Sequence, residues 1–378
     1  MLRKLTAVFF LLCSLVLVVA TQAQDAATED VPVASGLNAP RHLRFGSDGT
    51  LYIAEAGFGG DLTAVGPSGN GEVSLGTSGR VSTVLPSGEQ SNLIDGLLSI
   101  VDSSMYSEGV SDVLVNDAGD TAWLVLGQGP MPESIPADPG GIMTAVVKYT
   151  LPDLVSSTVI DTYGFEVANN PDGASDMASN PQEIAVAADG TIYIVDASAN
   201  SLLSWTEADG LKLVTAWAVD ESGATPSPVP SSLALASDGS LYVGFLSGYP
   251  FNAGGAKIEH WVNGALAETF EGLTLVTDVA VGQDGNLYAV QFADGFGQTG
   301  FNQNSGSVVQ VTADGITPIM TGLNFPYGIA ENANGEWFVS INSAFSAPGT
   351  GAVLKVRQGE VIAPASTPIV TPDVTPEA

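Results

Sequence analysis

The sequence is poor in basic residues and in histidine. Its 10 lysines and arginines stand against 41 aspartates and glutamates, histidine occurs only twice, and the net charge is −31. A field of this sign repels nucleic acids and anionic membrane surfaces, so we expect neither as a partner. Charged residues are only 13% of the chain and hydrophobic residues 45%, which excludes a disordered polyanion.

Cysteine is nearly absent, since Cys13 is the only one and lies in the apolar start of the chain. Arg3 and Lys4 precede a mostly apolar run over residues 5–20, and small residues surround Ala23, as is typical of a secretory signal peptide. The run is short for a membrane span, so we expect cleavage and no stable membrane insertion, the alternative being an uncleaved anchor. The mature protein would be secreted or extracytoplasmic, without disulfides or a cysteine nucleophile. Its 8 basic and 41 acidic residues would give a net charge of −33.

The other end of the chain also differs from the middle. Residues 366–378, STPIVTPDVTPEA, combine Thr-Pro repeats with acidic residues, which is typical of an extended, flexible segment. We therefore expect a signal peptide at 1–23, a short linker at 24–30, one folded domain at 31–364 and a flexible acidic tail at 365–378.

A hairpin motif recurs six times in the middle of the chain. Each copy has an apolar run, a turn that ends in glycine, and a second apolar run with an aromatic residue near its start; Asp-Gly or Asn-Gly pairs are expected to supply positive φ angles at the turn. The copies lie at 43–53, 113–125, 184–194, 233–243, 279–289 and 329–339. Their turn glycines are separated by 70, 71, 49, 46 and 50 residues, which indicates a period near 50 with insertions in the first two copies.

Third and fourth strands follow the hairpins, for example at 306–311 (GSVVQV) and 316–321 (ITPIMT). Four antiparallel strands at this period are typical of propeller blades. The sequence therefore predicts an all-β protein, a six-bladed β-propeller of four-stranded antiparallel blades.

The start of the domain predicts how the ring closes. Residues 31–40, VPVASGLNAP, resemble residues 317–326, TPIMTGLNFP, which form the outer strand and turn before the sixth hairpin. An N-terminal strand would complete the last blade and remove an exposed sheet edge. Residues 360–364, EVIAP, could fill the same place from the other end, and the sequence leaves this open.

We number the residues of each inner strand by their distance from the turn glycine, so that column −5 contains the residues five positions before it in the six repeats. Residues of one column are expected to point to the same side of their strands. In column −5, four of six residues are alanine, as expected beside a crowded axis. Column −7 should point to the same side and ring one mouth of the central channel. It holds His42, Asp112, Glu183, Ser232, Asp278 and Gly328.

Carboxylates in such a ring suit a hard cation or a polar ligand. Asp112, Glu183 and Asp278 could coordinate Ca²⁺ or another divalent cation. The alternative is that each carboxylate accepts hydrogen bonds from backbone N–H groups of a neighbouring blade. The oxygen-rich loop 169–183, NNPDGASDMASNPQE, lacks the spacing of an EF-hand.

Three further polar residues lie in the first repeat. Arg41 and Arg44 are expected to pair with the acidic ring, and Glu55 ends the second strand, where it is expected to reach solvent. No G-x-S-x-G, H-E-x-x-H or P-loop motif is present, so no catalytic residue is assigned. The candidate ligand-binding set is Arg41, His42, Asp112, Glu183, Ser232, Asp278 and Glu55.

Several of these segments together resemble the ScyD/ScyE family of exported bacterial propeller proteins with NHL-like repeats. The resemblance covers roughly residues 31–357 and is carried by GLNAPRHLRFGSDGTLYIAEAGFGG at 36–60, GVSDVLVNDAGDTAWLVLGQG at 109–129 and NPQEIAVAADGTIYIVDASAN at 180–200. It implies an exported six-bladed propeller and no assigned reaction. His42 departs from the small residue, usually glycine, that the family has after Pro-Arg.

Gluconolactonase-like propellers are similar in their hairpin pattern and hold a divalent metal with Asn and Asp one position before column −7. Here that position, column −8, contains no carboxylate and no asparagine, which counts against the same lactonase site. Column −8 holds Arg41, Ser111, Gln182, Ser231, Thr277 and Tyr327.

These observations favour a secreted, non-catalytic protein that binds a small molecule or an extracellular protein through loops at one face. The long insertions at 57–79, 97–108 and 127–141 would extend that face. The alternatives are a metal-assisted hydrolase or isomerase that uses the carboxylate ring, and a structural extracellular protein. We expect a monomer.

Overall fold

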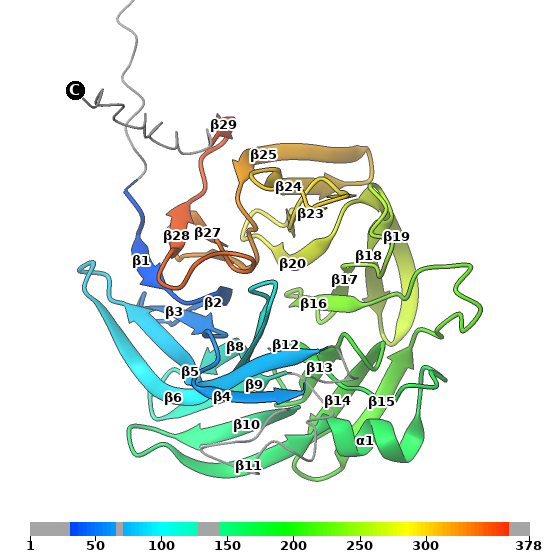
Figure 1. The fold of residues 1–378 in the computed structure, drawn as a ribbon, viewed down its shortest axis with the longest axis horizontal. Helices are drawn as coiled ribbons and strands as arrows, with labels where there is room; N and C mark the ends of the chain where they lie inside the picture. Colours follow the sequence, from blue (N-terminus) through cyan, green and yellow to red (C-terminus); the bar gives the residue numbers. More distant parts are fainter. Residues whose placement is uncertain (1–30, 66–70, 128–143, 363–378) are drawn as a thin grey trace, which may run out of the picture. The chain divides into compact units, whose positions relative to one another are not determined.

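Six antiparallel sheets follow one another around a ring in the computed structural model, which describes residues 31–65, 71–127 and 144–362 (Figure 1). The predicted six-bladed β-propeller is thereby confirmed. The predicted signal peptide, linker and tail lie outside the described residues. Among the described residues the only helix is α1 (Thr162–Asn169), and no helix there is long and apolar enough to cross a bilayer.

Blades 1 to 3 each run from an inner strand at the axis to an outer strand. Blade 1 consists of β2 (Pro40–Phe45), β3 (Leu51–Glu55), β5 (Glu72–Val84) and β6 (Gln90–Asp102), and is extended by β4 (Leu62–Val65) and β7 (Ser107–Glu108). Blade 2 consists of β8 (Val110–Val115), β9 (Thr121–Leu126), β10 (Ala145–Thr150) and β11 (Val155–Asp161). Blade 3 consists of β12 (Pro181–Val186), β13 (Ile192–Asp196), β14 (Ser201–Thr206) and β15 (Gly210–Ala216).

Blades 4 to 6 repeat this order. Blade 4 consists of β16 (Pro230–Leu235), β17 (Leu241–Phe245), β18 (Ala256–Val262) and β19 (Ala265–Leu273). Blade 5 consists of β20 (Val276–Val281), β21 (Leu287–Gln291), β24 (Gly306–Thr312) and β25 (Gly315–Leu323), and the short hairpin β22 (Phe296–Gly297) and β23 (Gly300–Phe301) projects between its second and third strands. Blade 6 contains β26 (Ile329–Glu331), β27 (Trp337–Ile341) and β28 (Gly351–Lys355).

The ring closes through the N-terminal strand, as the repeat at residues 31–40 suggested. Strand β1 (Ala34–Leu37) pairs antiparallel with β28, with Ala34 opposite Val353. The competing C-terminal segment takes a different place, because β29 (Glu360–Val361) pairs in parallel with β25 of blade 5. Each terminal segment therefore covers an outer sheet edge that would otherwise be open.

The six hairpins have the pairing that the sequence pattern predicted, but the turn chemistry differs. Gly49 has a positive φ of 84°, whereas Asp48 does not adopt that conformation. The Asp48 carboxylate instead accepts a hydrogen bond from the Thr50 N–H at 2.9 Å. The expectation that both residues of the Asp-Gly pair supply positive φ angles is therefore wrong, since only the glycine does so.

Column −6 forms the apolar contact between blades. Its residues are exposed by 4% or less: Leu43, Val113, Ile184, Leu233, Val279 and Ile329. Because β-strand side chains alternate, burial of this column directs the neighbouring columns −5 and −7 toward the axis.

Candidate functional site

Two cavities lie at opposite ends of the inner strands. Column −5 contributes all six of its residues to a cavity of about 430 Å³, lined by Arg44, Leu114, Ala185, Ala234, Ala280 and Ala330 among others. Column −8 contributes to the other cavity, of about 380 Å³, with Arg41, Gln182, Ser231, Thr277 and Tyr327. We call the second one the aromatic cavity, for the rings described below.

Column −7 lies between the two cavities as a buried layer. Five of its residues are exposed by 3% or less: His42, Asp112, Glu183, Ser232 and Asp278. The prediction that this column rings an open mouth is therefore wrong, although Glu183 and Asp278 do reach the lining of the column −5 cavity. A bulge between columns −9 and −7 in four of the inner strands, and between columns −9 and −6 in blade 1, shifts the register there.

Arg44 compensates part of the negative charge of this layer. Its Nε and Nη2 donate to Asp112 at 3.1 and 2.7 Å, and Nη2 also donates to Glu183 Oε1 at 2.9 Å. The pairing predicted for Arg44 is confirmed. The neighbouring carboxylates raise the pKa of Arg44 although burial acts to lower it.

The carboxylates also connect neighbouring blades through backbone groups. Asp112 accepts from Ile184 N at 3.2 Å, Glu183 from Leu233 N at 2.7 Å, and Asp278 from Ile329 N at 2.7 Å. Each donor lies at column −6 of the next blade. This is the arrangement that the sequence analysis left as the alternative to a cation site.

His42, Glu183 and Asp278 form a buried trio whose potential ligand atoms lie within 4.8 Å of one another. By residue type this trio could hold a divalent cation. The His42 nitrogens, however, already face carbonyl oxygens, Nδ1 that of Ser111 at 2.9 Å and Nε2 that of Thr277 at 3.3 Å. Both ring nitrogens are therefore already engaged by backbone oxygens, and a metal would have to displace one of these contacts.

The ionisation of the trio follows from its burial. Burial raises the pKa of Asp278 to about 6, although His42 acts to lower it. Burial and the charge of Asp278 likewise raise the pKa of Glu183 well above its usual range. Asp112, the third metal ligand suggested by the sequence, lies outside the trio and pairs with Arg44. The Ser232 Oγ is buried without a hydrogen-bond partner.

Glu55 serves the fold of blade 1. It is 0% exposed, so the expectation that it reaches solvent is wrong. Its carboxylate accepts from Arg80 Nε at 2.8 Å, from the Ser82 hydroxyl and from Asn38 N at 2.5 Å. It therefore ties β3 to β5 and to the turn after β1.

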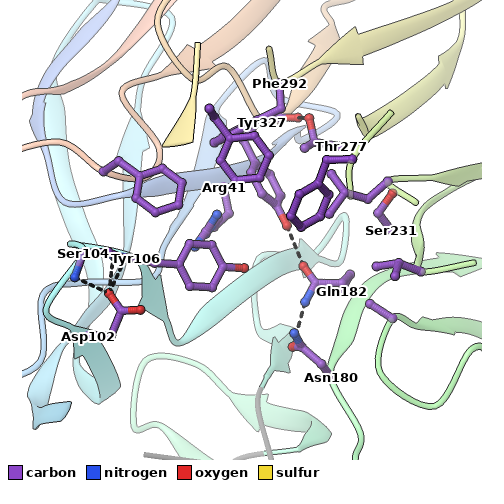
Figure 2. Close-up of a pocket in the computed structure, with 16 residues that line it drawn as sticks. Arg41, Asp102, Ser104, Tyr106, Asn180, Gln182, Ser231, Thr277, Phe292 and Tyr327 are labelled. Atoms are coloured by element: carbon purple, nitrogen blue, oxygen red, sulfur yellow. Dashed lines mark hydrogen bonds between the residues drawn. The ribbon is translucent and has the colours of Figure 1, made fainter. Parts of the chain in front are cut away.

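Arg41 does not pair with the acidic layer, contrary to expectation, and lies at the base of the aromatic cavity (Figure 2). Its guanidinium carbon is 4.5 Å from the centre of the Tyr327 ring and 5.4 Å from that of Tyr106. Its Nη2 donates to the carbonyl of Ser107. Arg41 is only 3% exposed, and within residues 31–65, 71–127 and 144–362 its Nη1 has no hydrogen-bond partner.

A hydrogen-bonded chain fixes the polar wall of the aromatic cavity (Figure 2). The Tyr327 hydroxyl donates to Gln182 Oε1 at 2.6 Å, and Gln182 Nε2 donates to Asn180 Oδ1 at 2.7 Å. Burial raises the pKa of Tyr327 to about 12 against the charge of Arg41, so its hydroxyl stays neutral and can donate. Burial also raises the pKa of Glu108, although the neighbouring charge of Arg41 acts to lower it.

Aromatic rings form a continuous path from the cavity to the surface. Ring centres are 5.6 Å apart for Tyr106 and Phe345, 5.7 Å for Phe345 and Phe301, and 4.9 Å for Phe301 and Phe296. The path ends at Tyr249, 6.4 Å from Phe296 and 74% exposed. Such a path offers stacking partners at every depth of the cavity.

Sequence reasoning considered column −8 only as a position without metal ligands and missed the aromatic residues. Phe251, Phe292, Phe301 and Phe345 lie in segments that follow the second strands of blades 4, 5 and 6. The repeated placement of phenylalanine after the second strand was the available signal. Those segments have no shared length, so the pattern is not seen when the repeats are aligned on their turns.

Comparison with known proteins supports the fold. No protein-family profile matches the chain, and no curated protein is similar to it in sequence. A gluconolactonase structure from Xanthomonas campestris is 12% identical with a TM-score of 0.51, covering 86% of this chain and 88% of its own. A luciferin-regenerating enzyme is 10% identical with a TM-score of 0.50, covering 87% and 94%. A streptogramin B lyase is 12% identical with a TM-score of 0.46, covering 86% and 97%.

Proposed function

We propose that the protein is an exported propeller of the ScyD/ScyE type that binds a small planar aromatic anion, without catalysis, in the aromatic cavity. The observation that carries this proposal is Arg41, a buried guanidinium that lines the aromatic cavity and whose Nη1 has no hydrogen-bond partner among the described residues. The protein acts as a monomer in this proposal.

The positive charge favours an anion as the ligand. A buried guanidinium without an acceptor for one nitrogen carries an unfavourable desolvation free energy. A carboxylate that accepted a hydrogen bond from Nη1 would remove this deficit through a charge-assisted bond. The stacked rings of Tyr106 and Tyr327 hold the guanidinium in place, so little conformational entropy is lost on binding.

The lining favours an aromatic body for the ligand. Six aromatic residues line the cavity: Tyr106, Phe251, Phe292, Phe301, Tyr327 and Phe345. Aromatic pairs in offset or edge-to-face contact contribute about 0.5–1.5 kcal/mol beyond their buried area. Polar groups at the base and rings along the walls therefore suit an anionic group that enters first and a planar body that follows.

A metal-assisted hydrolase or isomerase is the less favoured function. It would need His42, Glu183 and Asp278 to exchange their present hydrogen bonds for a cation, and this trio is separated from the aromatic cavity by the Tyr327 ring, which contacts His42 at a ring-centre distance of 5.2 Å. A purely structural role would leave the unpaired donor of Arg41 without an explanation.

Calorimetric titration of the mature protein with 2-naphthoate tests the proposal, with the neutral 2-naphthamide and the non-aromatic cyclohexanecarboxylate as comparison ligands. We expect 2-naphthoate to bind at least about tenfold more tightly than either, which corresponds to 1.4 kcal/mol or more. Arg41→Met should abolish the preference for the anion, and Phe301→Ala should weaken both aromatic ligands.

The exposed Lys212→Met is the matched control, because it removes one positive charge far from the cavity. Thermal unfolding of each variant shows whether it folds, and Phe301→Ala keeps the test valid should Arg41→Met fail to do so. Equal affinity for all three ligands, or an unchanged preference in folded Arg41→Met, would overturn the proposal. N-terminal sequencing of protein from the culture medium tests export and cleavage after Ala23.

A further inference from the structure

Three buried carboxylates gather where helix α1 packs, through Phe165, between blades 2 and 3. Glu166 is 1% exposed, Asp172 3% and Asp196 0%. Within residues 31–65, 71–127 and 144–362, none of the three forms an ion pair with a lysine, arginine or histidine. Buried charges of one sign without a counterion are strongly unfavourable, so this cluster needs either a proton or a cation.

Two of these carboxylates are fully engaged by protein groups. Asp196 accepts from the Ser179 hydroxyl at 2.5 Å and from the backbone N–H of Asn180 at 2.7 Å. Asp172 accepts from Ala174 N at 2.9 Å and from Asn200 Nδ2 at 2.9 Å. Burial nevertheless raises the pKa of Asp196, although its hydrogen bonds act to lower it.

Glu166 differs, because neither of its carboxylate oxygens has a hydrogen-bond partner in the part of the chain that the structure describes. The side-chain oxygen of Asn170, four residues later, also lacks one. Asn170 is the C-cap of α1 in a left-handed conformation with a φ of 42°, and its N–H donates to the Glu166 carbonyl at 2.8 Å. Its Nδ2 donates to the carbonyl of Ala174 at 3.0 Å. The free oxygens of Glu166 and Asn170 therefore both belong to the C-terminal end of α1.

We infer that Glu166 and Asn170 bind a Ca²⁺ ion, with Asp172 and Asp196 supplying compensating negative charge close by. The available atoms are all oxygens, carboxylate and amide, which are the ligands that Ca²⁺ prefers, and Ca²⁺ accepts irregular sets of six to eight ligands that include water. Mg²⁺ demands near-ideal octahedral geometry and gives up its water reluctantly, so a buried position favours Ca²⁺.

Water would complete the coordination. In the described part of the chain, three acidic or histidine ligand atoms converge within 4.8 Å only at His42, Glu183 and Asp278. Glu166, Asp172 and Asp196 therefore do not bring three ligand atoms to one point, and in this inference Asp172 and Asp196 contribute negative charge near the ion. Because Asp172 lies in the connection between α1 and β12, the ion would tie α1 to blade 3 and should stabilise the folded protein.

The competing explanation is that Glu166 simply carries a proton. Burial, followed by the charges of Asp172 and Asp196, raises the pKa of Glu166 to about 7. A protonated Glu166 would be indifferent to Ca²⁺, and glutamine would replace it without loss. The two explanations therefore make opposite predictions for the same variant.

Thermal unfolding of the full mature protein at pH 7.5, in EDTA, in CaCl₂ and in MgCl₂, tests the inference. We expect CaCl₂ to raise the melting temperature by several degrees over EDTA and MgCl₂ to raise it less. Glu166→Gln should fold, should be at least as stable as wild type in EDTA because a buried charge is gone, and should lose the response to Ca²⁺. Glu207→Gln, on an exposed turn, is the matched control and should keep the response.

Asp278→Asn separates this site from the axial trio. It should retain the full response to Ca²⁺ if the ion binds at Glu166. Loss of the response in Asp278→Asn but not in Glu166→Gln would place the ion at the axis and overturn the inference. A wild-type protein that is indifferent to Ca²⁺ would overturn it as well. The inference uses no residue of the aromatic cavity, so its failure and that of the proposed ligand site are distinguishable.

Discussion

Arg44 and Asp112 face each other across the boundary between blades 1 and 2, with Nε and Nη2 of the arginine donating to the two carboxylate oxygens at 3.1 and 2.7 Å. The same Nη2 also donates to Glu183 and to the carbonyl of Ile184 in blade 3. One guanidinium therefore joins three consecutive blades at the axis. A planar fork with several donors is needed for this geometry, and lysine could not replace it.

Replacement of Arg44 should destabilise the propeller strongly. Arg44→Met leaves the carboxylates of Asp112 and Glu183 buried without their counterion, which typically costs about 3–5 kcal/mol. The free energy of unfolding in urea measures this. Lys212→Met, which breaks a pair whose side chains are 57% and 61% exposed, should change it by under about 0.5 kcal/mol. If Arg44→Met and Lys212→Met changed the free energy of unfolding equally, Arg44 would not stabilise the propeller by joining its blades.

Asp278 should make stability depend on pH. Its pKa is about 6 in the folded protein, above the value of about 3.9 for an unfolded aspartate, so the folded state holds the proton more tightly. The contribution of this group to stability is therefore greatest at low pH and is lost as pH rises from about 4 to about 6.

Asp278→Asn removes this titration while keeping an oxygen for the N–H of Ile329. The free energy of unfolding of wild type minus that of Asp278→Asn should be smaller at pH 7.5 than at pH 4.5. Urea unfolding at the two pH values measures the difference. A difference that rises with pH would show that Asp278 is stabilised as a carboxylate and would refute the prediction.

Glu55 should matter for stability and leave ligand binding unchanged. Glu55→Ala leaves the Asn38 N–H, the Ser82 hydroxyl and Arg80 without their acceptor, and a cost of about 3 kcal/mol is expected from buried groups of this kind. The exposed Glu89→Ala is the control and should be neutral. Urea unfolding together with 2-naphthoate titration separates the two effects. If Glu55→Ala folded but no longer bound 2-naphthoate, Glu55 would contribute to ligand binding and the prediction would be wrong.

The closing strand β1 should be indispensable. Leu37 is 0% exposed and Ala34 2%, and the strand pairs with β28. A chain that begins at residue 39 exposes the edge of blade 6 and should aggregate or lose cooperative unfolding, whereas one that begins at residue 31 should not. Removal of residues 358–378, which include β29, should cost little, because β29 forms only two residue pairs with β25. Circular dichroism and size-exclusion chromatography measure both outcomes.

The blades and their register could be predicted because they depend on local chemistry. Gly49 requires a positive φ, Tyr52 suits a half-buried pleated surface, and the alternation along residues 184–194 places Ile184 opposite Ile194, as observed. The alanines of column −5 face the axis as predicted, but they line a cavity there and not a crowded centre. The −7 carboxylates were assigned to an open mouth instead of a buried layer, because a repeat pattern gives the side to which a residue points but not its depth along the axis.

The sequence by itself therefore determined the strands, the number of blades and the candidate residues, because turn residues and period-2 alternation act within a few positions of the chain. Only the tertiary structure decided what those residues do. Arg41 and Arg44 are three positions apart, yet one lies under an aromatic cavity and the other joins three blades. That difference arises from rings and carboxylates of other blades, such as Tyr327 and Glu183, which closure of the ring brings beside them.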